Sequence, residues 1–174
     1  MKKIDLDLEV LVANNARSSF FYEANGTSLE LDRFGDDEYV SLRFLKSLST
    51  GSSKRLLKNL ILLIVDTNDE DVTVFDVLDN LKITRFYKEL QELLLLEEDE
   101  IIDNDTLEEF ILKADEQQFK KALDNEMLYT VLAETALHLY RENNIPTGYV
   151  EMVLTKQGVD NIYDFLDDVR MSSN

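Results

Sequence analysis

Apolar and acidic residues alternate along the start of the chain. Over residues 4–10 every second position is Ile, Leu or Val, and the positions between them are acidic, which is the pattern of a strand with one buried face. Farther along, Asn25-Gly26 stands between two β-prone runs, and this pair favours a hairpin because both residues accept a positive φ. We therefore expect an antiparallel β-meander of three strands over residues 4–33.

A short helix and one more strand are expected next. Ser41 can cap a helix over residues 42–48, whose leucines lie on one side. Residues 60–65 are apolar at every position, which is typical of a strand that is buried on both faces. The acidic run over residues 66–71 ends this strand.

From residue 73 onward the spacing of apolar residues changes to three and four, which predicts helices. Thr73 and Thr84 are expected to cap the first two helices, Pro146 fits the first position of a later one, and Gly158 suits its end. The predicted helices cover residues 74–81, 84–96, a segment that begins at 105 or 106, 117–123, 128–140, 147–156 and 162–169. Short connections imply antiparallel neighbours in a compact array.

These elements define the expected fold class and domain organisation. The class is α+β, with an N-terminal antiparallel β-meander plus one buried strand, packed on a C-terminal array of six or seven helices. Residues 1–72 form the β-rich part and residues 73–174 the helical part of one continuous domain. Six side chains of the helices are expected to be buried together: Phe86, Leu90, Phe110, Leu132, Ala133 and Ala136.

Charge is distributed very unevenly along the chain. The formal net charge is −18, yet residues 39–65 contain no acid and five bases. The other residues hold 13 bases and all 36 acids, a charge of −23. Such a basic segment suits charge-steered docking on carboxylates, on a neighbouring copy or on another partner. The predicted partner-binding residues are Arg43, Lys46, Lys54, Arg55 and Lys58.

Within this segment, the loop over residues 49–55 is the best candidate for small-ligand chemistry. Its hydroxyls, backbone N–H groups and two cations could hold a phosphate or a carboxylate. It is not a P-loop, because no Lys follows Gly51 directly. A flexible connector, a protein contact and a nucleotide site all remain open, and the net charge disfavours nucleic acid.

Metal, cofactor and catalytic signatures are weak. The chain has no Cys and one His, which excludes thiolate and imidazole-rich sites. Asp66, Asn68 and Glu70 imitate the start of an EF-hand loop, but valines stand where later ligands belong. His138 is expected to be a boundary residue paired with Glu134 or Glu142. We predict no metal, no cofactor and no enzymatic activity.

Three runs of the sequence carry a resemblance to known proteins: Val40–Leu48, Val72–Leu90 and Gly158–Leu166. Together with the apolar strand, they resemble small accessory and structural proteins of tailed phages that infect low-GC bacteria. The resemblance implies a virion component or a viral accessory protein. It identifies no site residue.

The expected function is therefore that of a non-enzymatic phage structural or assembly protein, which acts through protein–protein contacts in the virion. Its partners would be other subunits, in a homo-oligomer or a particle. The alternative is a phage-encoded acidic inhibitor that mimics nucleic acid and blocks a host enzyme, for which a continuous acidic stripe would be needed. No apolar run is long enough to span a membrane and no signal peptide is evident, so we expect the cytoplasm of the bacterial host or the virion.

Overall fold

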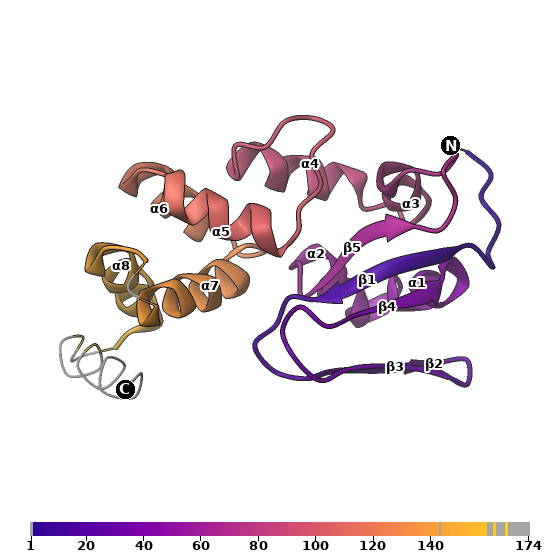
Figure 1. Ribbon diagram of the computed structural model, residues 1–174, viewed down its shortest axis with the longest axis horizontal. Helices are drawn as coiled ribbons and strands as arrows, with labels where there is room; N and C mark the ends of the chain where they lie inside the picture. Colours follow the sequence, from indigo (N-terminus) through magenta and orange to yellow (C-terminus); the bar gives the residue numbers. More distant parts are fainter. Residues whose placement is uncertain (1, 143, 160–161, 163–165, 167–174) are drawn as a thin grey trace. The chain divides into compact units, whose positions relative to one another are not determined.

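The computed structural model describes residues 2–142 and 144–159 together with Ile162 and Leu166 (Figure 1). Over these residues the fold is α+β, as predicted, with five strands in two antiparallel sheets and eight α-helices. The chain divides into two compact units, residues 1–106 and 107–174, which are treated separately below. The unit boundary lies after the first helices beyond residue 73, so these helices belong with the strands.

A three-stranded sheet forms the centre of the first unit. Its middle strand is β1 (Glu9–Asn14), which pairs with β4 (Asp37–Ser41) on one side and with β5 (Leu62–Thr67) on the other. Both pairings are antiparallel, and a bulge interrupts the register with β5 between Leu11 and Val12. Val10 and Val12 are fully buried because the apolar positions of β1 point to the core face.

The predicted hairpin is confirmed, but the three-stranded meander to which it was assigned does not form. Strands β2 (Phe20–Ala24) and β3 (Thr27–Leu31) form a separate two-stranded sheet, and Asn25 and Gly26 have φ of 54° and 77°. The first strand does not join this hairpin in a meander. This strand begins at Glu9 and not at residue 4 as expected. It pairs with β4, a strand that was not predicted, and with β5, the predicted apolar strand. Local alternation predicts a strand but does not specify which strand it pairs with.

Four helices complete the first unit. Ser41 caps α1 (Leu42–Leu48) as predicted, since its Oγ accepts a hydrogen bond from the Phe44 N–H. A 3₁₀ turn at Gly51–Ser53 leads into α2 (Lys54–Lys58), which was not predicted as a helix. The other two helices are α3 (Val74–Asn80) and α4 (Thr84–Leu93). Thr84 does not cap α4, because its Oγ1 instead donates a hydrogen bond to Asp79 Oδ1 at 2.8 Å.

Two buried asparagines at the end of β1 join the loops of this unit. The Asn14 side-chain amide donates to the carbonyls of Ser18 at 2.9 Å and Arg33 at 3.1 Å. The Asn15 amide donates to the Leu60 carbonyl at 2.8 Å, and the Asn15 N–H bonds the Ile61 carbonyl at 2.9 Å. The bonds of Asn14 join the β1–β2 loop to the β3–β4 loop. The bonds of Asn15 hold the chain reversal between α2 and β5.

The second unit is helical over its described residues. Its helices are α5 (Asn104–Lys113), which begins at the unit boundary, α6 (Glu116–Leu123), α7 (Tyr129–Arg141) and α8 (Thr147–Gln157). Gly158 ends α8 with φ of 74°, as predicted, whereas Pro146 is the N-cap and not the first helical residue. The predicted helix over residues 162–169 lies almost entirely outside the described residues.

The six side chains that were predicted to be buried together are divided between the two units, and one of them is not buried. Phe110, Leu132, Ala133 and Ala136 are buried and belong to residues 107–174, whereas Leu90 is buried in the unit of residues 1–106. Phe86, in that same unit, is only half-buried. Among the described residues, no helix combines the length and the apolar character needed to cross a bilayer.

The packing of α7 predicts a large cost for truncating Leu132, which is 0% exposed. Leu132→Ala should lower the free energy of unfolding by about 2–5 kcal/mol, because it leaves a cavity in the helical core. Urea denaturation followed by circular dichroism measures the change. Leu112→Ala, at a side chain that is 54% exposed, is the control and should change the free energy by less than about 0.5 kcal/mol. Equal losses in both variants would contradict the packing described here.

Candidate functional site

The five predicted partner-binding residues lie in two groups. Arg43 and Lys46 belong to α1, and Arg43 Nη2 forms an ion pair with Asp7 Oδ1 at 2.9 Å. Lys46 lines a hollow at the tip of the β2–β3 hairpin, where Asn25 donates to Ser47 Oγ at 2.7 Å. Part of the charge of α1 is therefore compensated within the chain.

The other three cations lie on α2 and form no ion pair with a carboxylate of the described residues. Lys54 Nζ donates to the backbone carbonyl of Lys82 at 3.4 Å, and Lys58 Nζ lies 3.4 Å from the centroid of the Phe86 ring. Arg55 is exposed and makes no hydrogen bond or ion pair with the described part of the chain. Three positive charges therefore remain uncompensated on one short helix.

Lys82 joins this group through the fold. It ends α3 with φ of 58°, a conformation that usually selects Gly, and its carbonyl receives the bond from Lys54. The sequence analysis missed Lys82 because it stands outside residues 39–65, beyond the acidic run over residues 66–71 and the helix α3. We call Lys54, Arg55, Lys58 and Lys82 the basic α2 face.

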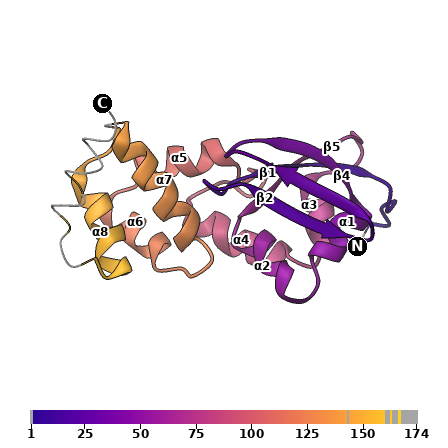
Figure 2. The ribbon, with the colours of Figure 1, turned by 90° about the horizontal axis from the view of Figure 1, so that it is seen from below.

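The basic α2 face rests on a firmly packed support. Figure 2 shows α2 beside α4, and the two helices share a small apolar cleft. Leu57 and Leu60 are 4% and 2% exposed, so α2 is held by its apolar side. The Lys58–Phe86 contact adds a cation–π attraction at the edge of this cleft. The cations therefore project from a fixed scaffold.

Three of the four hydroxyls of the candidate anion-binding loop are already engaged. Ser49 Oγ donates to the Lys46 carbonyl at 2.9 Å, and Thr50 Oγ1 donates to the Ser47 carbonyl at 2.7 Å. Ser53 Oγ donates to the Thr50 carbonyl at 2.8 Å. These bonds shape the turn that leads into α2, which favours the connector role for this loop.

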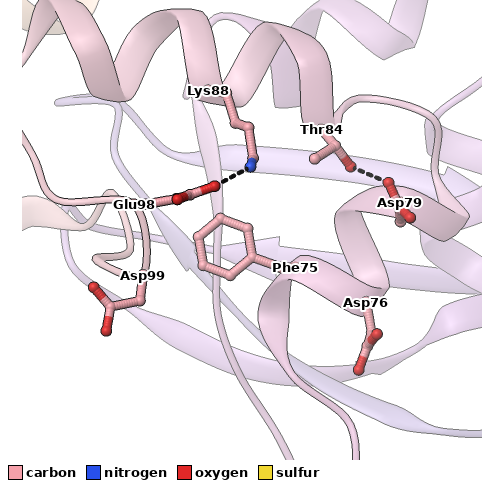
Figure 3. A pocket seen from close by; sticks show the side chains of 7 residues that line it. All are labelled: Phe75, Asp76, Asp79, Thr84, Lys88, Glu98 and Asp99. Carbon is pink, nitrogen blue, oxygen red and sulfur yellow. Dashed lines mark hydrogen bonds and ion pairs between the residues drawn. The ribbon is translucent and has the colours of Figure 1, made fainter.

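An acidic cavity, which we call the Phe75 cavity, lies between α3, α4 and the loop after α4 (Figure 3). Its volume is about 680 Å³. Four carboxylates, one amine, one hydroxyl and one aromatic ring line it: Asp76, Asp79, Glu98, Asp99, Lys88, Thr84 and Phe75. The acidic run over residues 97–100 was considered from the sequence only as a metal site and lacks a metal-binding motif. Its proximity to the aspartates of α3 was not predicted, because the fold brings the two separate segments together.

Ion pairs and backbone bonds keep part of this cavity ionised. Lys88 Nζ lies 2.8 Å from Glu98 Oε1, and this bond lowers the pKa of the Glu98 carboxyl and raises that of the Lys88 ammonium. The pKa of the Asp76 carboxyl is lowered chiefly by the Thr73 backbone N–H. The nearby Lys2 ammonium, whose Nζ is 3.5 Å from Asp76 Oδ2, lowers it further.

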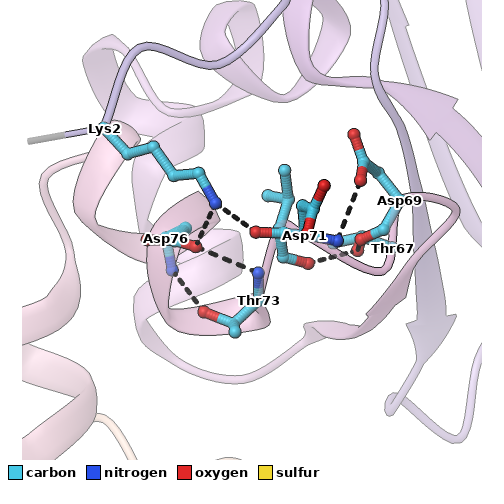
Figure 4. Close-up of polar contacts among 7 residues, drawn as sticks. Lys2, Thr67, Asp69, Asp71, Thr73 and Asp76 are labelled. Atoms are coloured by element: carbon cyan, nitrogen blue, oxygen red, sulfur yellow. Dashed lines mark hydrogen bonds and ion pairs between the residues drawn. The ribbon is translucent and has the colours of Figure 1, made fainter.

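The N-terminal segment connects α3 to the acidic loop after β5 (Figure 4). Lys2 donates to the Asp71 carbonyl as well as pairing with Asp76. In the same loop, Asp69 Oδ1 accepts from the Asp71 N–H at 2.9 Å. Asn68, the second residue of the EF-hand-like run, forms two hydrogen bonds with Glu9. Its Oδ1 accepts from the Glu9 N–H, and its Nδ2 donates to Glu9 Oε2. These contacts give the run a structural role at the end of the sheet.

The histidine singled out from the sequence has a local role. His138 Nε2 lies 3.3 Å from Glu142 Oε1, and the imidazole is 34% exposed, as expected for a boundary residue of α7. No group of three or more His, Asp or Glu side chains suited to a metal ion occurs among the residues that the structure describes.

The lowered pKa of Asp76 predicts a pH-dependent contribution to stability. A carboxyl whose pKa is lower in the folded chain stabilises it above the pKa of the unfolded state, and this contribution is lost as the pH falls through the folded value. Asp76→Asn should therefore lower the free energy of unfolding at neutral pH, and its difference from wild type should shrink below about pH 4.

Urea denaturation at neutral and acidic pH measures this difference. Asp99→Asn is the control, because Asp99 is exposed and contacts no other described side chain, and it should change the free energy little at either pH. A difference for Asp76→Asn that stays constant from neutral to acidic pH would show that the carboxylate charge does not matter.

Comparison with protein-family models, with curated proteins and with solved structures found no match to this chain. Its function is therefore inferred from its own residues.

Proposed function

We propose that this protein is a non-enzymatic assembly protein that acts through protein–protein contacts, with the basic α2 face docking on carboxylates of a partner. One observation carries the proposal. Lys54, Arg55 and Lys58 have no carboxylate partner among the described residues, although the chain contains 36 acids. A chain this acidic offers many partners to its own cations, so three neighbouring cations without one suggest an external partner.

The uncompensated charge would guide a partner during its approach and would also select the surface on which the partner binds. Positive charges held close together on α2 repel one another, and an approaching carboxylate surface relieves that repulsion. Surrounding acids repel the same partner elsewhere, so the approach is guided to the basic α2 face. Because Arg55 is exposed and Lys54 and Lys58 are partly exposed, the contact should weaken as salt screens the charges.

The setting that we propose is a tailed-phage particle or its assembly. The support is the resemblance of Val40–Leu48, Val72–Leu90 and Gly158–Leu166 to small phage proteins. The first run contains α1, and the second contains α3 and most of α4. Structural and assembly proteins of particles act by docking on other subunits, in agreement with a basic face that is separated from an acidic body.

The alternative, an acidic inhibitor that mimics nucleic acid, fits the charge pattern less well. A mimic needs carboxylates in a continuous exposed stripe. Around α3 and α4, Lys2 pairs with Asp76 and Lys88 pairs with Glu98, so cations interrupt the carboxylates where they gather. This interleaving supports the assembly function over the inhibitor.

Reversing the charge of α2 tests the proposal. A tagged chain is purified from the cells in which it is naturally made, after nuclease treatment, and the accompanying proteins, including untagged copies of the same chain, are quantified by mass spectrometry. The triple variant Lys54→Glu, Arg55→Glu, Lys58→Glu should lose these proteins by about tenfold or more, because the partner's carboxylates are now repelled. Higher salt should have the same effect on the wild-type chain.

The matched control carries the same change of charge on α5 and α6. In Lys113→Glu, Lys120→Glu, Lys121→Glu, all three side chains are exposed, so the fold and the partners should be retained. If the α2 variant keeps the same partners as the control, or if no protein accompanies the wild-type chain, the proposed function is wrong.

A further inference from the structure

The basic α2 face requires a counter-surface with carboxylates and with room for a long side chain, and the Phe75 cavity provides both. The face and the cavity belong to the same unit, residues 1–106, so each is described independently of the second unit. Figure 3 shows the Phe75 ring between the Lys88–Glu98 pair and the two aspartates of α3. A cation that enters this cavity would meet carboxylates from both sides.

Only part of the negative charge of the cavity is compensated. Lys2 pairs with Asp76 at 3.5 Å and Lys88 pairs with Glu98 at 2.8 Å. Asp79 accepts a bond from the Thr84 hydroxyl but forms no ion pair with the described residues, and Asp99 has no partner among them. Four carboxylates and two ammonium groups therefore meet at this cavity, and Asp79 and Asp99 are the two carboxylates that form no ion pair within the described chain.

The aromatic wall favours a cationic guest. A guanidinium or an ammonium is attracted to an aromatic ring by the quadrupole of the ring, in addition to any carboxylate that it meets. The chain already makes this type of contact elsewhere, since Lys58 Nζ lies 3.4 Å from the centroid of Phe86. Phe75 is half-buried and is supported by Tyr87, with the two ring centroids 5.9 Å apart.

The loop that carries Glu98 and Asp99 is held in place before any guest arrives. Gln91, only 3% exposed, donates from its amide to the carbonyls of Glu97 at 3.2 Å and Glu100 at 2.6 Å. The Glu97 N–H also bonds to Glu100 Oε2 at 3.0 Å. A preformed loop loses little conformational entropy on binding, which favours association.

These observations lead to a specific partner. We propose that the basic α2 face docks on a second copy of this chain, with Arg55 entering the Phe75 cavity between Asp79 and Asp99. This inference rests on the proposed function, because it names the partner of the same face. Within one copy, the cations of α2 do not contact the carboxylates of the cavity, so the pairing forms between copies. Because two different surfaces meet, copies can add head to tail and form a chain or a closed ring.

A charge-swap experiment on the purified chain tests this contact. The mass distribution is measured by sedimentation velocity at about 50 mM and about 500 mM NaCl, since exposed ion pairs weaken as the Debye length falls. The wild-type chain should self-associate at low salt and dissociate toward monomers at high salt. Arg55→Glu alone and Asp99→Arg alone should each remain monomeric at low salt.

Mixing the two variants should restore association. The new carboxylate at position 55 of one variant attracts the new guanidinium at position 99 of the other. In the opposite contact, the unchanged Arg55 of the second variant meets the unchanged Asp99 of the first. Asp99 is chosen over Asp79 because it has no contact in the described chain that its replacement would break. Lys120→Glu, at an exposed residue of α6, is the matched control for Arg55→Glu and should associate like wild type.

The results separate this inference from the proposed function. If the wild-type chain is monomeric at low salt at the highest concentration reached, or if Arg55→Glu associates like wild type, then the inference is wrong. The same holds if the mixture of variants stays monomeric. The proposed function survives these results as long as the triple variant of α2 still loses its cellular partners, and it fails when that variant retains them or when no protein accompanies the wild-type chain.

Discussion

Hydrogen bonds from two buried asparagines at the end of β1 hold the first unit together. Asn14 is 0% exposed and Asn15 is 2% exposed, and between them they satisfy carbonyls of the β1–β2 loop, the β3–β4 loop and the reversal before β5. Each of these bonds ties a loop carbonyl to the end of β1, and a typical hydrogen bond within a protein stabilises it by about 0.5–1.5 kcal/mol. The separate hairpin, the central sheet and α2 are thereby fixed around one point of the chain.

The chain reversal at Leu60 connects the basic helix α2 to the buried strand β5. Leu60 has φ of 55° and is 2% exposed, so a buried leucine adopts a conformation that usually favours Gly. The Asn15 bond to its carbonyl and the burial of its side chain offset that strain. Directly before Leu60 the basic α2 face points to solvent, and directly after it β5 enters the core. The packing of the core around Leu60 therefore determines where the cations of α2 lie.

Short-range features were the most predictable part of this structure. The Ser41 and Thr73 caps, the Asn25-Gly26 turn and the Gly158 stop each depend on one or two residues, and all were confirmed. The partners of β1 and the short strand β4 could not be predicted, because pairing depends on which distant strand competes best for the core. The charge of residues 39–65 was evident from the sequence. Its extension to Lys82 and the Phe75 cavity was not, because both depend on the reversals that bring α2, α3 and α4 together.

The central claim is that the cations of α2 meet carboxylates of another molecule and not of their own chain. Zero-length carbodiimide cross-linking of a mixture of ¹⁴N- and ¹⁵N-labelled chains, read out by mass spectrometry, tests it directly. The account predicts links from Lys54 or Lys58 to Asp79, Glu98 or Asp99 in pairs of mixed isotopic label, which form only between copies. Links from these lysines that occur only in pairs of a single label would show that the cations pair within one chain, and would contradict the account.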